Sequence, residues 1–203
     1  MTSRAITRGI AVGAATAFAA GALALSGTGV AGAATGTTTW ADYYTTFTRT
    51  VSNTTPDAGD IITMTTKFQR TNGTEEYLYN IKDRHDSCLA YVPGSAKMND
   101  VSVIPQVVDD GSVPGRDALV SIDFGPNEWV VKNQPAFNPV FSVSYKVGAD
   151  CVRGRVLVTG MDYNGSLGFG GYYTQGPGIT VSYLNNEGPG GIGTGSLGSL
   201  FGS

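Results

Sequence analysis

The stretch "DIITMTTKF", residues 60–68, decides the fold class of this 203-residue chain. Three of its large apolar residues, Ile62, Met64 and Phe68, fall on one side of an alternating pattern, and threonine or lysine occupies the positions between them. Successive side chains of a β-strand point to opposite faces, so this pattern predicts a strand with one buried face and one wet face. Thr66 falls on the apolar side and is expected to be buried with its neighbours.

The same alternation of period two appears in three further runs: "ALVSIDF" (118–124), "VFSVSYKV" (140–147) and "GITVSY" (178–183). No window after the N-terminal segment has a convincing helical period. The residues expected on the buried faces of these runs are Val120, Ile122, Phe124, Phe141, Val143, Tyr145, Val147, Ile179, Val181 and Tyr183. One wet and one dry face per strand is typical of antiparallel sheets that pack face to face.

About nine strand-like runs can be read along the chain, separated by turn sequences rich in Gly, Pro, Asn and Asp. They lie near 40–51, 60–70, 76–83, 88–92, 101–108, 117–124, 138–147, 154–162 and 178–184. This number of strands at this spacing predicts an all-β fold, an antiparallel β-sandwich of immunoglobulin-like type. Periodicity does not fix the order of the strands, so a closed barrel remains an alternative.

The two ends of the chain differ from this central domain, which we place at residues 34–184. Residues 1–33 read as a secretory signal peptide: Arg4 and Arg8 precede an apolar run over 9–25, and small residues end the segment. Because a polar, Thr-rich stretch follows, cleavage is favoured over a retained membrane helix, and no transmembrane segment is expected after cleavage. Residues 185–203 are rich in Gly and Ser, which predicts a flexible tail.

The charge of the chain argues against nucleic acid as a partner. The formal net charge is −3 at pH 7, and removal of two arginines with the signal peptide changes it to about −5. The basic residues are scattered singly, without the patch that a nucleic-acid-binding surface requires. Export instead favours a secreted or envelope-associated protein, with a cell-envelope component or another surface protein as its partner.

Two segments resemble a known family. "TPDAGDIITMTTKF" (55–68) followed by "LAYVPGSA" (89–96) is similar to the "conserved repeat" domains of bacterial surface proteins, in which a Pro-x-x-Gly-Asp turn precedes a Thr-rich strand. The resemblance covers roughly residues 50–165 and implies an immunoglobulin-like domain without catalytic residues. The signal peptide and the ending "GSLGSLFGS" also resemble short secreted proteins of mycolic-acid-bearing actinobacteria.

The two cysteines, Cys88 and Cys151, are predicted to form a disulfide, because an even count in an exported protein favours pairing. Such a bridge would close a loop of more than sixty residues, worth roughly 4 kcal/mol in the chain-entropy model. Free or metal-bound cysteines are an alternative, as is a catalytic thiol that uses His85, the single histidine. In a strand, residues three apart point to opposite faces, which disfavours a Cys88–His85 pair.

Other catalytic chemistry has little support, and no cofactor is expected. The sequence has no "GxSxG" elbow, and one histidine with two cysteines is too few ligands for a zinc site unless carboxylates contribute. Acid pairs at 83–86 and 109–110 could serve a carboxylate-dependent hydrolase, although acids near turns are usually solvated. Asp162 and Asn164 are a weak calcium candidate, for which a hairpin turn at Asn164–Gly165 is the simpler explanation.

The Gly-rich stretch 166–178 carries the candidate ligand-binding residues Phe169, Tyr172 and Tyr173. Aromatic side chains on a flexible loop can bind a glycan or a protein, or they can fold back and close the end of a sandwich. The sequence thus leaves three hypotheses: a non-catalytic structural or adhesion module of the cell envelope, a binding module that uses this loop, and a hydrolase that works through carboxylates.

Overall fold

The computed structural model of the chain describes residues 33–114, 117–172 and 174–183. The predicted signal peptide, apart from Ala33, and the predicted tail at 185–203 lie outside these residues. Within the described part the chain forms β-strands and one turn of 3-10 helix, Pro135–Phe137. None of the described segments is a helix long and apolar enough to span a bilayer.

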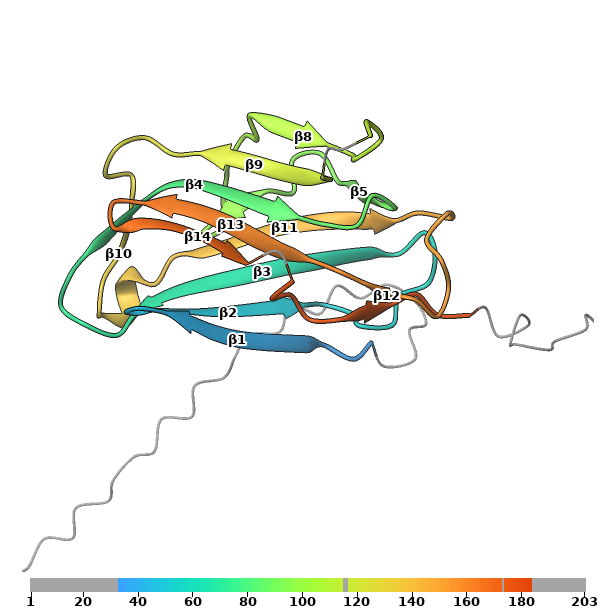
Figure 1. Ribbon diagram of the computed structural model, residues 1–203, viewed down its shortest axis with the longest axis horizontal. Coiled ribbons are helices and arrows are strands. Elements are labelled where there is room, and N and C mark those ends of the chain that lie inside the picture. Colours follow the sequence, from blue (N-terminus) through green and yellow to red (C-terminus); the bar gives the residue numbers. More distant parts are fainter. Residues whose placement is uncertain (1–32, 115–116, 173, 184–203) are drawn as a thin grey trace, which may run out of the picture. The chain divides into compact units, whose positions relative to one another are not determined.

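Two antiparallel sheets make up most of the described chain (Figure 1). Sheet A contains, in spatial order, β1 (Gly36–Asp42), β2 (Thr45–Val51), β3 (Ile61–Arg70), β11 (Val140–Val147), β6 (Lys97–Met98) and β7 (Val101–Ser102), and β5 (Leu89–Tyr91) also pairs with β11. Sheet B contains β14 (Gly168–Tyr172), β13 (Gly160–Gly165), β4 (Glu76–Arg84), β9 (Leu119–Asp123) and β8 (Val107–Asp109), and β10 (Trp129–Val131) also pairs with β4. A small third pair joins β12 (Val156–Leu157) to β15 (Ile179–Thr180).

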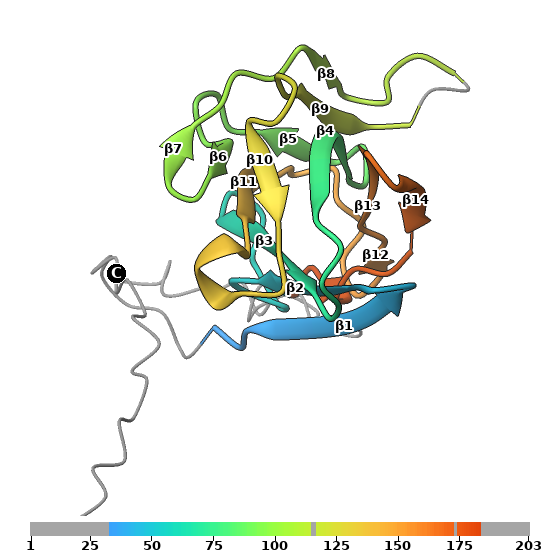
Figure 2. The same ribbon diagram turned by 90° about the vertical axis from the view of Figure 1, so that its left-hand side faces the viewer.

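The two large sheets face each other, as the end-on view of Figure 2 shows. Among the described residues, the side chains between them form one apolar core. The alternation read from the sequence gives the inner faces: Ile62, Met64, Thr66 and Phe68 of β3 are all buried. In β11 the inward side chains are those of Phe141, Val143, Tyr145 and Val147, also as predicted. The all-β sandwich is therefore confirmed.

The turn predicted at residues 56–60 is tied to β11 by backbone hydrogen bonds. Gly59 has φ 97°, a conformation that glycine adopts without steric cost, and its amide donates to the carbonyl of Val147 at 2.8 Å. The Asp60 side chain accepts a hydrogen bond from the amide of Asp57 at 3.0 Å. These contacts set the start of β3 in register with the end of β11.

The run predicted as one strand over 40–51 is two strands, because the chain reverses at Tyr43 and Tyr44. Tyr43 has φ 47°, a left-handed conformation that is uncommon for a residue other than glycine. Neither Gly nor Pro marks this turn in the sequence. The alternating pattern therefore continues across it and conceals the hairpin of β1 and β2.

The sequence also predicts a flexible loop over 166–178, and this prediction is wrong for residues 168–172, which form strand β14 in register with β13. The hairpin turn is Ser166–Leu167, two residues beyond the turn predicted at Asn164–Gly165. A side chain at Gly170 would collide with the ring of Tyr172. The glycines that suggest a loop thus make room for an aromatic side chain that packs across the strand.

Smaller departures concern the ends of strands. Tyr183 is half exposed instead of buried, because β15 ends at Thr180. The run at 101–108 is divided into β7 and β8, which belong to different sheets. Strand β10 has no counterpart among the predicted runs, since its three residues are too few to show a period.

Candidate functional site

A disulfide joins Cys88 and Cys151, as the sequence predicts. Their Sγ atoms are 2.08 Å apart and their Cα atoms 5.1 Å apart, within the range that a disulfide requires. Cys88 directly precedes β5, and Cys151 lies in the turn after β11, the strand with which β5 pairs. Because both sulfurs are bonded to each other, neither can act as a nucleophile or a metal ligand.

A buried ion pair, Arg49 with Asp83, lies in the centre of the sandwich; we call it the central pair. Both side chains are 0% exposed, and two hydrogen bonds of 2.6 and 3.1 Å join the guanidinium to the carboxylate. Arg49 comes from β2 of sheet A and Asp83 from β4 of sheet B, so the pair connects the two sheets. Arg49 also donates to Thr66 Oγ1 at 2.9 Å, which explains why a threonine occupies the buried face of β3.

Tyr145 of β11 completes this network, because its hydroxyl donates to Asp83 Oδ1 at 2.8 Å. Burial, together with the neighbouring carboxylate of Asp83, raises the pKa of Tyr145 well above its usual range. Burial alone would lower the pKa of Arg49, but the charge of Asp83 raises it, and the guanidinium stays protonated. Asp83, one of the acids considered for hydrolysis, is therefore held inside the core.

His85 directly follows β4 and packs on Tyr145, with ring centroids 4.4 Å apart. Its Nδ1 lies 2.9 Å from the carbonyl oxygen of Asp86, and the side chain is buried. Burial lowers the pKa of His85 below the usual 6.5. His85 thus packs against a core residue, and it faces the tyrosine instead of a reactive thiol.

The remaining acids considered for catalysis or metal binding are engaged elsewhere. Asp109 and Asp110 accept hydrogen bonds from backbone amides two residues later, as turn-forming acids do. Asp162 forms an ion pair with Arg84 at 2.8 Å, and the backbone of Asn164 is part of β13. Strands β4 and β9 separate the calcium candidates from Asp109. Over the described residues, no three His, Cys, Asp or Glu side chains are grouped so that they could hold a metal ion.

A cavity of about 340 Å³ opens at one end of the sandwich, between the turn of β1 and β2 and the turn of β13 and β14; we call it the end pocket. Its apolar lining comes from these two turns and from the start of β14: Tyr43, Tyr44, Leu167 and Phe169. Its polar lining consists of Asp42, Thr45, Arg70, Thr74, Glu76 and Tyr163. Sheet A supplies one side of the mouth and sheet B the other.

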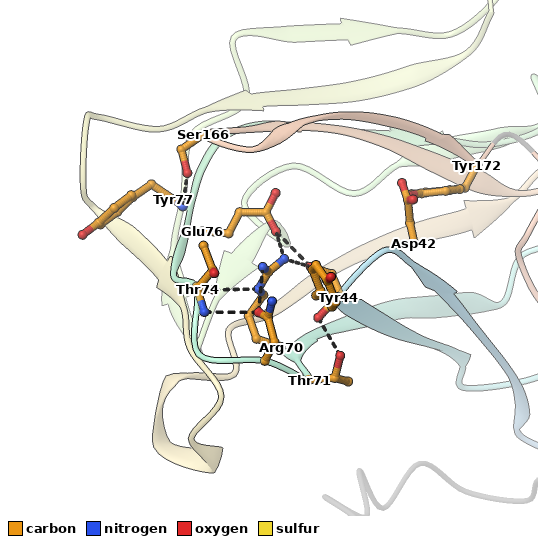
Figure 3. Close-up of polar contacts among 11 residues, drawn as sticks. Asp42, Tyr44, Arg70, Thr71, Thr74, Glu76, Tyr77, Ser166 and Tyr172 are labelled. Carbon is orange, nitrogen blue, oxygen red and sulfur yellow. Dashed lines mark hydrogen bonds and ion pairs between the residues drawn. The ribbon is translucent and has the colours of Figure 1, made fainter.

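Arg70 and Glu76 form a second buried ion pair beneath this pocket; we call it the end pair (Figure 3). The guanidinium lies 3.3 Å from Glu76 Oε2 and donates to Thr45 Oγ1 at 2.7 Å and to the carbonyl of Thr74 at 2.9 Å. Thr45 in turn donates to Glu76 at 2.9 Å. The guanidinium carbon also lies 5.9 Å from the centre of the Tyr44 ring. These hydrogen bonds use Glu76 Oε2, whereas Glu76 Oε1 is buried without a hydrogen-bond partner among the described residues.

The aromatic residues singled out in the sequence have different positions. Phe169 is 86% exposed at the mouth of the end pocket. Tyr172 packs against Phe47 with ring centroids 5.0 Å apart, and its hydroxyl donates to Asp42 at 2.5 Å. Burial and this hydrogen bond raise the pKa of Tyr172. Tyr172 thus closes the gap between β14 and β1, while Tyr173 lies outside the described residues.

Tyr43, Tyr44, Arg70 and Glu76 were not singled out by the sequence. They are brought together by the turn of β1 and β2 and by the connection from β3 of sheet A to β4 of sheet B. The alternation of apolar residues within a strand does not predict where such connections lie in space. The available signal was the pair of adjacent tyrosines at 43–44, because two large aromatic residues in succession cannot both face the core of a strand.

No protein-family model and no curated protein sequence matches the chain. Among solved structures, it is similar to a protein of Corynebacterium diphtheriae described as membrane anchored, with a TM-score of 0.53, 9% identity, and coverage of 73% of this chain and 38% of that one. It is also similar to the T6 backbone pilin of Streptococcus pyogenes, with a TM-score of 0.40, 14% identity, and coverage of 68% and 31%. The pilus backbone of Streptococcus pneumoniae gives a TM-score of 0.36, 13% identity, and coverage of 55% and 44%. The chain spans less than half of each protein, and the first match shows a shared β-sandwich fold.

Proposed function

We propose that this chain is an exported, non-catalytic module that serves at the bacterial cell envelope as a structural or adhesive unit. The observation that carries this proposal is how its reactive side chains are used. Cys88 is held in a disulfide, Asp83 in the central pair and His85 against Tyr145. These thiol, carboxylate and imidazole groups could take part in catalysis if they were free at a surface. Here they instead contact other strands and turns of the domain.

Two further observations support export to the envelope. A disulfide persists in an oxidising compartment, outside the cytoplasm. The first structural match is to a protein of Corynebacterium diphtheriae that is described as membrane anchored. In this proposal, residues 1–33 direct export, residues 34–184 form the domain, and residues 185–203 connect it to the envelope through Leu197, Leu200 and Phe201.

Fractionation of the producing cells tests this function. The full chain is expected in the cell-wall or membrane fraction, and a chain that ends at residue 189 is expected in the medium. A matched variant with Leu197→Ser, Leu200→Ser and Phe201→Ser keeps the length of the tail and should behave like the truncation. Recovery of the full chain from the medium would refute attachment to the envelope, and recovery from the cytoplasm would refute export.

A second candidate function is recognition of a glycan or a protein through the hairpin of β13 and β14. The observation that favours it is the exposure of Phe169 on the edge strand β14, since a large apolar side chain left in water contributes little to the stability of the fold. This function is compatible with the first, because an adhesive module needs a surface that binds.

A further inference from the structure

The mouth of the end pocket exposes four large apolar side chains. Tyr43 is 94% exposed and Tyr44 54%, on the turn of β1 and β2. Leu167, on the turn of β13 and β14, is 53% exposed, and Phe169, the second residue of β14, is 86% exposed. Hydrophobic side chains scattered singly over a surface are ordinary, but these four line one cavity. Exposed aromatic residues that share the rim of a concave site point to a ligand that covers them.

Beneath these rings the pocket offers hydrogen-bonding groups that are already ordered. Thr45, Arg70 and Glu76 hold one another in place through hydrogen bonds of 2.7 to 3.3 Å, and all three are buried. Asp42 is held by the hydroxyl of Tyr172. A ligand would meet donors and acceptors that need no rearrangement, which reduces the entropic cost of binding.

A second hollow lies on the outer face of sheet B, beyond Phe169; we call it the outer-face groove. Its volume is about 700 Å³, and it is lined mainly by polar side chains: Asn80, Lys82, Ser121, Asp123, Asp162 and Asn164. Phe169 borders both this groove and the end pocket. Its neighbours on β14 are Gly168, Gly170 and Gly171, so no side chain adjacent in the strand covers its ring.

We propose that the end pocket and the outer-face groove form one binding site for a neutral oligosaccharide, with the ring of Phe169 between two sugar units. A sugar ring has an apolar face of C–H groups, which packs on the negative face of an aromatic ring, and an edge of hydroxyl groups, which donate and accept hydrogen bonds. The rings at the rim match the first property. The carboxylates, amides and hydroxyls of the pocket and groove match the second.

The charged residues in the site favour a neutral ligand over other ligand classes. A cationic ligand would compete with Arg70, whose guanidinium already lies over the ring of Tyr44 and next to Glu76. An anionic ligand would meet the carboxylates of Asp42 in the pocket and of Asp123 and Asp162 in the groove. A protein partner is disfavoured because the groove is lined by the charged residues Lys82, Asp123 and Asp162, whereas the centre of a protein interface is depleted of charged residues.

The combined size of the two hollows implies more than one sugar unit. Pockets of roughly 300 to 1,000 Å³ bind small ligands, and each of the two hollows falls in that range by itself. The end pocket would hold one end of the chain, and the groove the following units. Affinity should therefore increase with the length of the oligosaccharide.

This inference rests on the proposed function, because an adhesive module at the envelope encounters such glycans, and it can be tested separately. The full chain is applied to an array of linear neutral oligosaccharides of two to six hexose or N-acetylhexosamine units, and the best binder is then titrated by calorimetry. Phe169→Ala and Tyr43→Ala should each weaken binding at least tenfold. Phe137→Ala, which removes an exposed ring that lines neither hollow, should leave binding unchanged.

A fourth variant tests whether the two hollows act as one site. Asn164→Ala should weaken binding of five- and six-unit chains severalfold and leave binding of the disaccharide unchanged. The proposal is wrong if the unaltered chain binds no oligosaccharide of the array, or if neither ring variant weakens binding. Capture of a protein that depends on Phe169 and Tyr43, without any binding of saccharide, would also overturn it. None of these three results depends on the cell fraction in which the chain is found.

Discussion

The central pair and the end pair have the same chemistry and different surroundings. In both, an arginine of sheet A meets a carboxylate of sheet B, and both pairs are buried. Arg49 and Asp83 are 34 residues apart and are enclosed by protein on every side. Arg70 and Glu76 are only six residues apart, across the turn from β3 to β4, and they lie beneath a cavity.

The partners of the two arginines show what this difference means. Arg49 depends on Asp83 for a bidentate contact, with Thr66 as a further acceptor. Arg70 has three other oxygen acceptors besides Glu76, including the carbonyl of Thr74. The central pair therefore belongs to the scaffold, whereas the end pair is a local support that also forms part of a surface.

Breaking the central pair should have the largest effect on stability. Asp83→Ala leaves the charge of Arg49 buried without a counterion and removes the acceptor of the Tyr145 hydroxyl. Loss of one partner from a buried pair costs about 3–5 kcal/mol, a large share of the stability of a single domain. Urea unfolding followed by the fluorescence of Trp40 and Trp129 measures this loss as a lower midpoint.

A double variant separates charge burial from packing at the same position. Arg49→Met combined with Asp83→Leu removes both charges, and it should recover most of the stability that Asp83→Ala loses. If the double variant is no more stable than Asp83→Ala, the loss comes from packing, and the uncompensated charge is not its cause.

The equivalent change in the end pair should cost less. Glu76→Ala removes one acceptor of Arg70, but the guanidinium keeps its contacts with Thr45, Thr74 and Asn72 and lies close to a pocket open to water. We expect a loss of about 1–3 kcal/mol, the cost of one charged hydrogen-bond partner. The same urea experiment compares it directly with Asp83→Ala. Equal losses from the two variants would show that the surroundings of the pairs do not matter.

Acid should distinguish the two pairs, because only the central network has a histidine beside it. Burial lowers the pKa of His85. Below about pH 6.5 this histidine is therefore protonated in the unfolded chain while it is still neutral in the folded chain. The stabilising contribution of neutral His85 is complete above that pH and decreases as the pH falls, by up to about 1.4 kcal/mol per pH unit. The charged groups that influence the pKa of His85 are Asp83, Asp86 and Arg49.

His85→Phe keeps a ring against Tyr145 and cannot be protonated. The free energy of unfolding, measured by urea at pH 7.5, 6.5, 5.5 and 5.0, should decrease more steeply in the unaltered chain than in this variant. If the free energy of unfolding decreases with pH equally in the two proteins, the loss of stability in acid comes from carboxylates and not from His85.

The fold could be predicted from the sequence where a strand has one dry face. The buried positions of β3 and β11 follow from the period of two, and the disulfide follows from an even cysteine count. Prediction was wrong where the backbone departs from that period. Tyr43 turns the chain without Gly or Pro, and the glycines of β14 conceal a paired strand.

The candidate site could be predicted only in part. Phe169 is exposed at the site, as a residue of the predicted binding stretch, but Tyr172 in the same stretch is a packing residue. The other half of the rim, Tyr43 and Tyr44, is distant in the sequence and is brought close by the pairing of sheets. Contacts between turns of different sheets depend on the order of the strands. The alternation of apolar residues along the sequence does not determine that order.

The smallest expected effect concerns the rim of the end pocket. Tyr44→Ala removes the ring under the Arg70 guanidinium and should cost about 0.5–1 kcal/mol, the value of a cation–π contact at an exposed site. Tyr43→Ala is the matched control: its side chain is almost fully exposed, and its loss should change the free energy of unfolding by no more than about 0.5 kcal/mol.

Equal losses of stability from the two tyrosine variants would show that the contact with Arg70 contributes nothing. If Tyr44→Ala lowers the free energy of unfolding slightly and Tyr43→Ala does not lower it, side chains at the rim of the end pocket can be replaced with little loss of stability. The central pair would then still connect the two sheets.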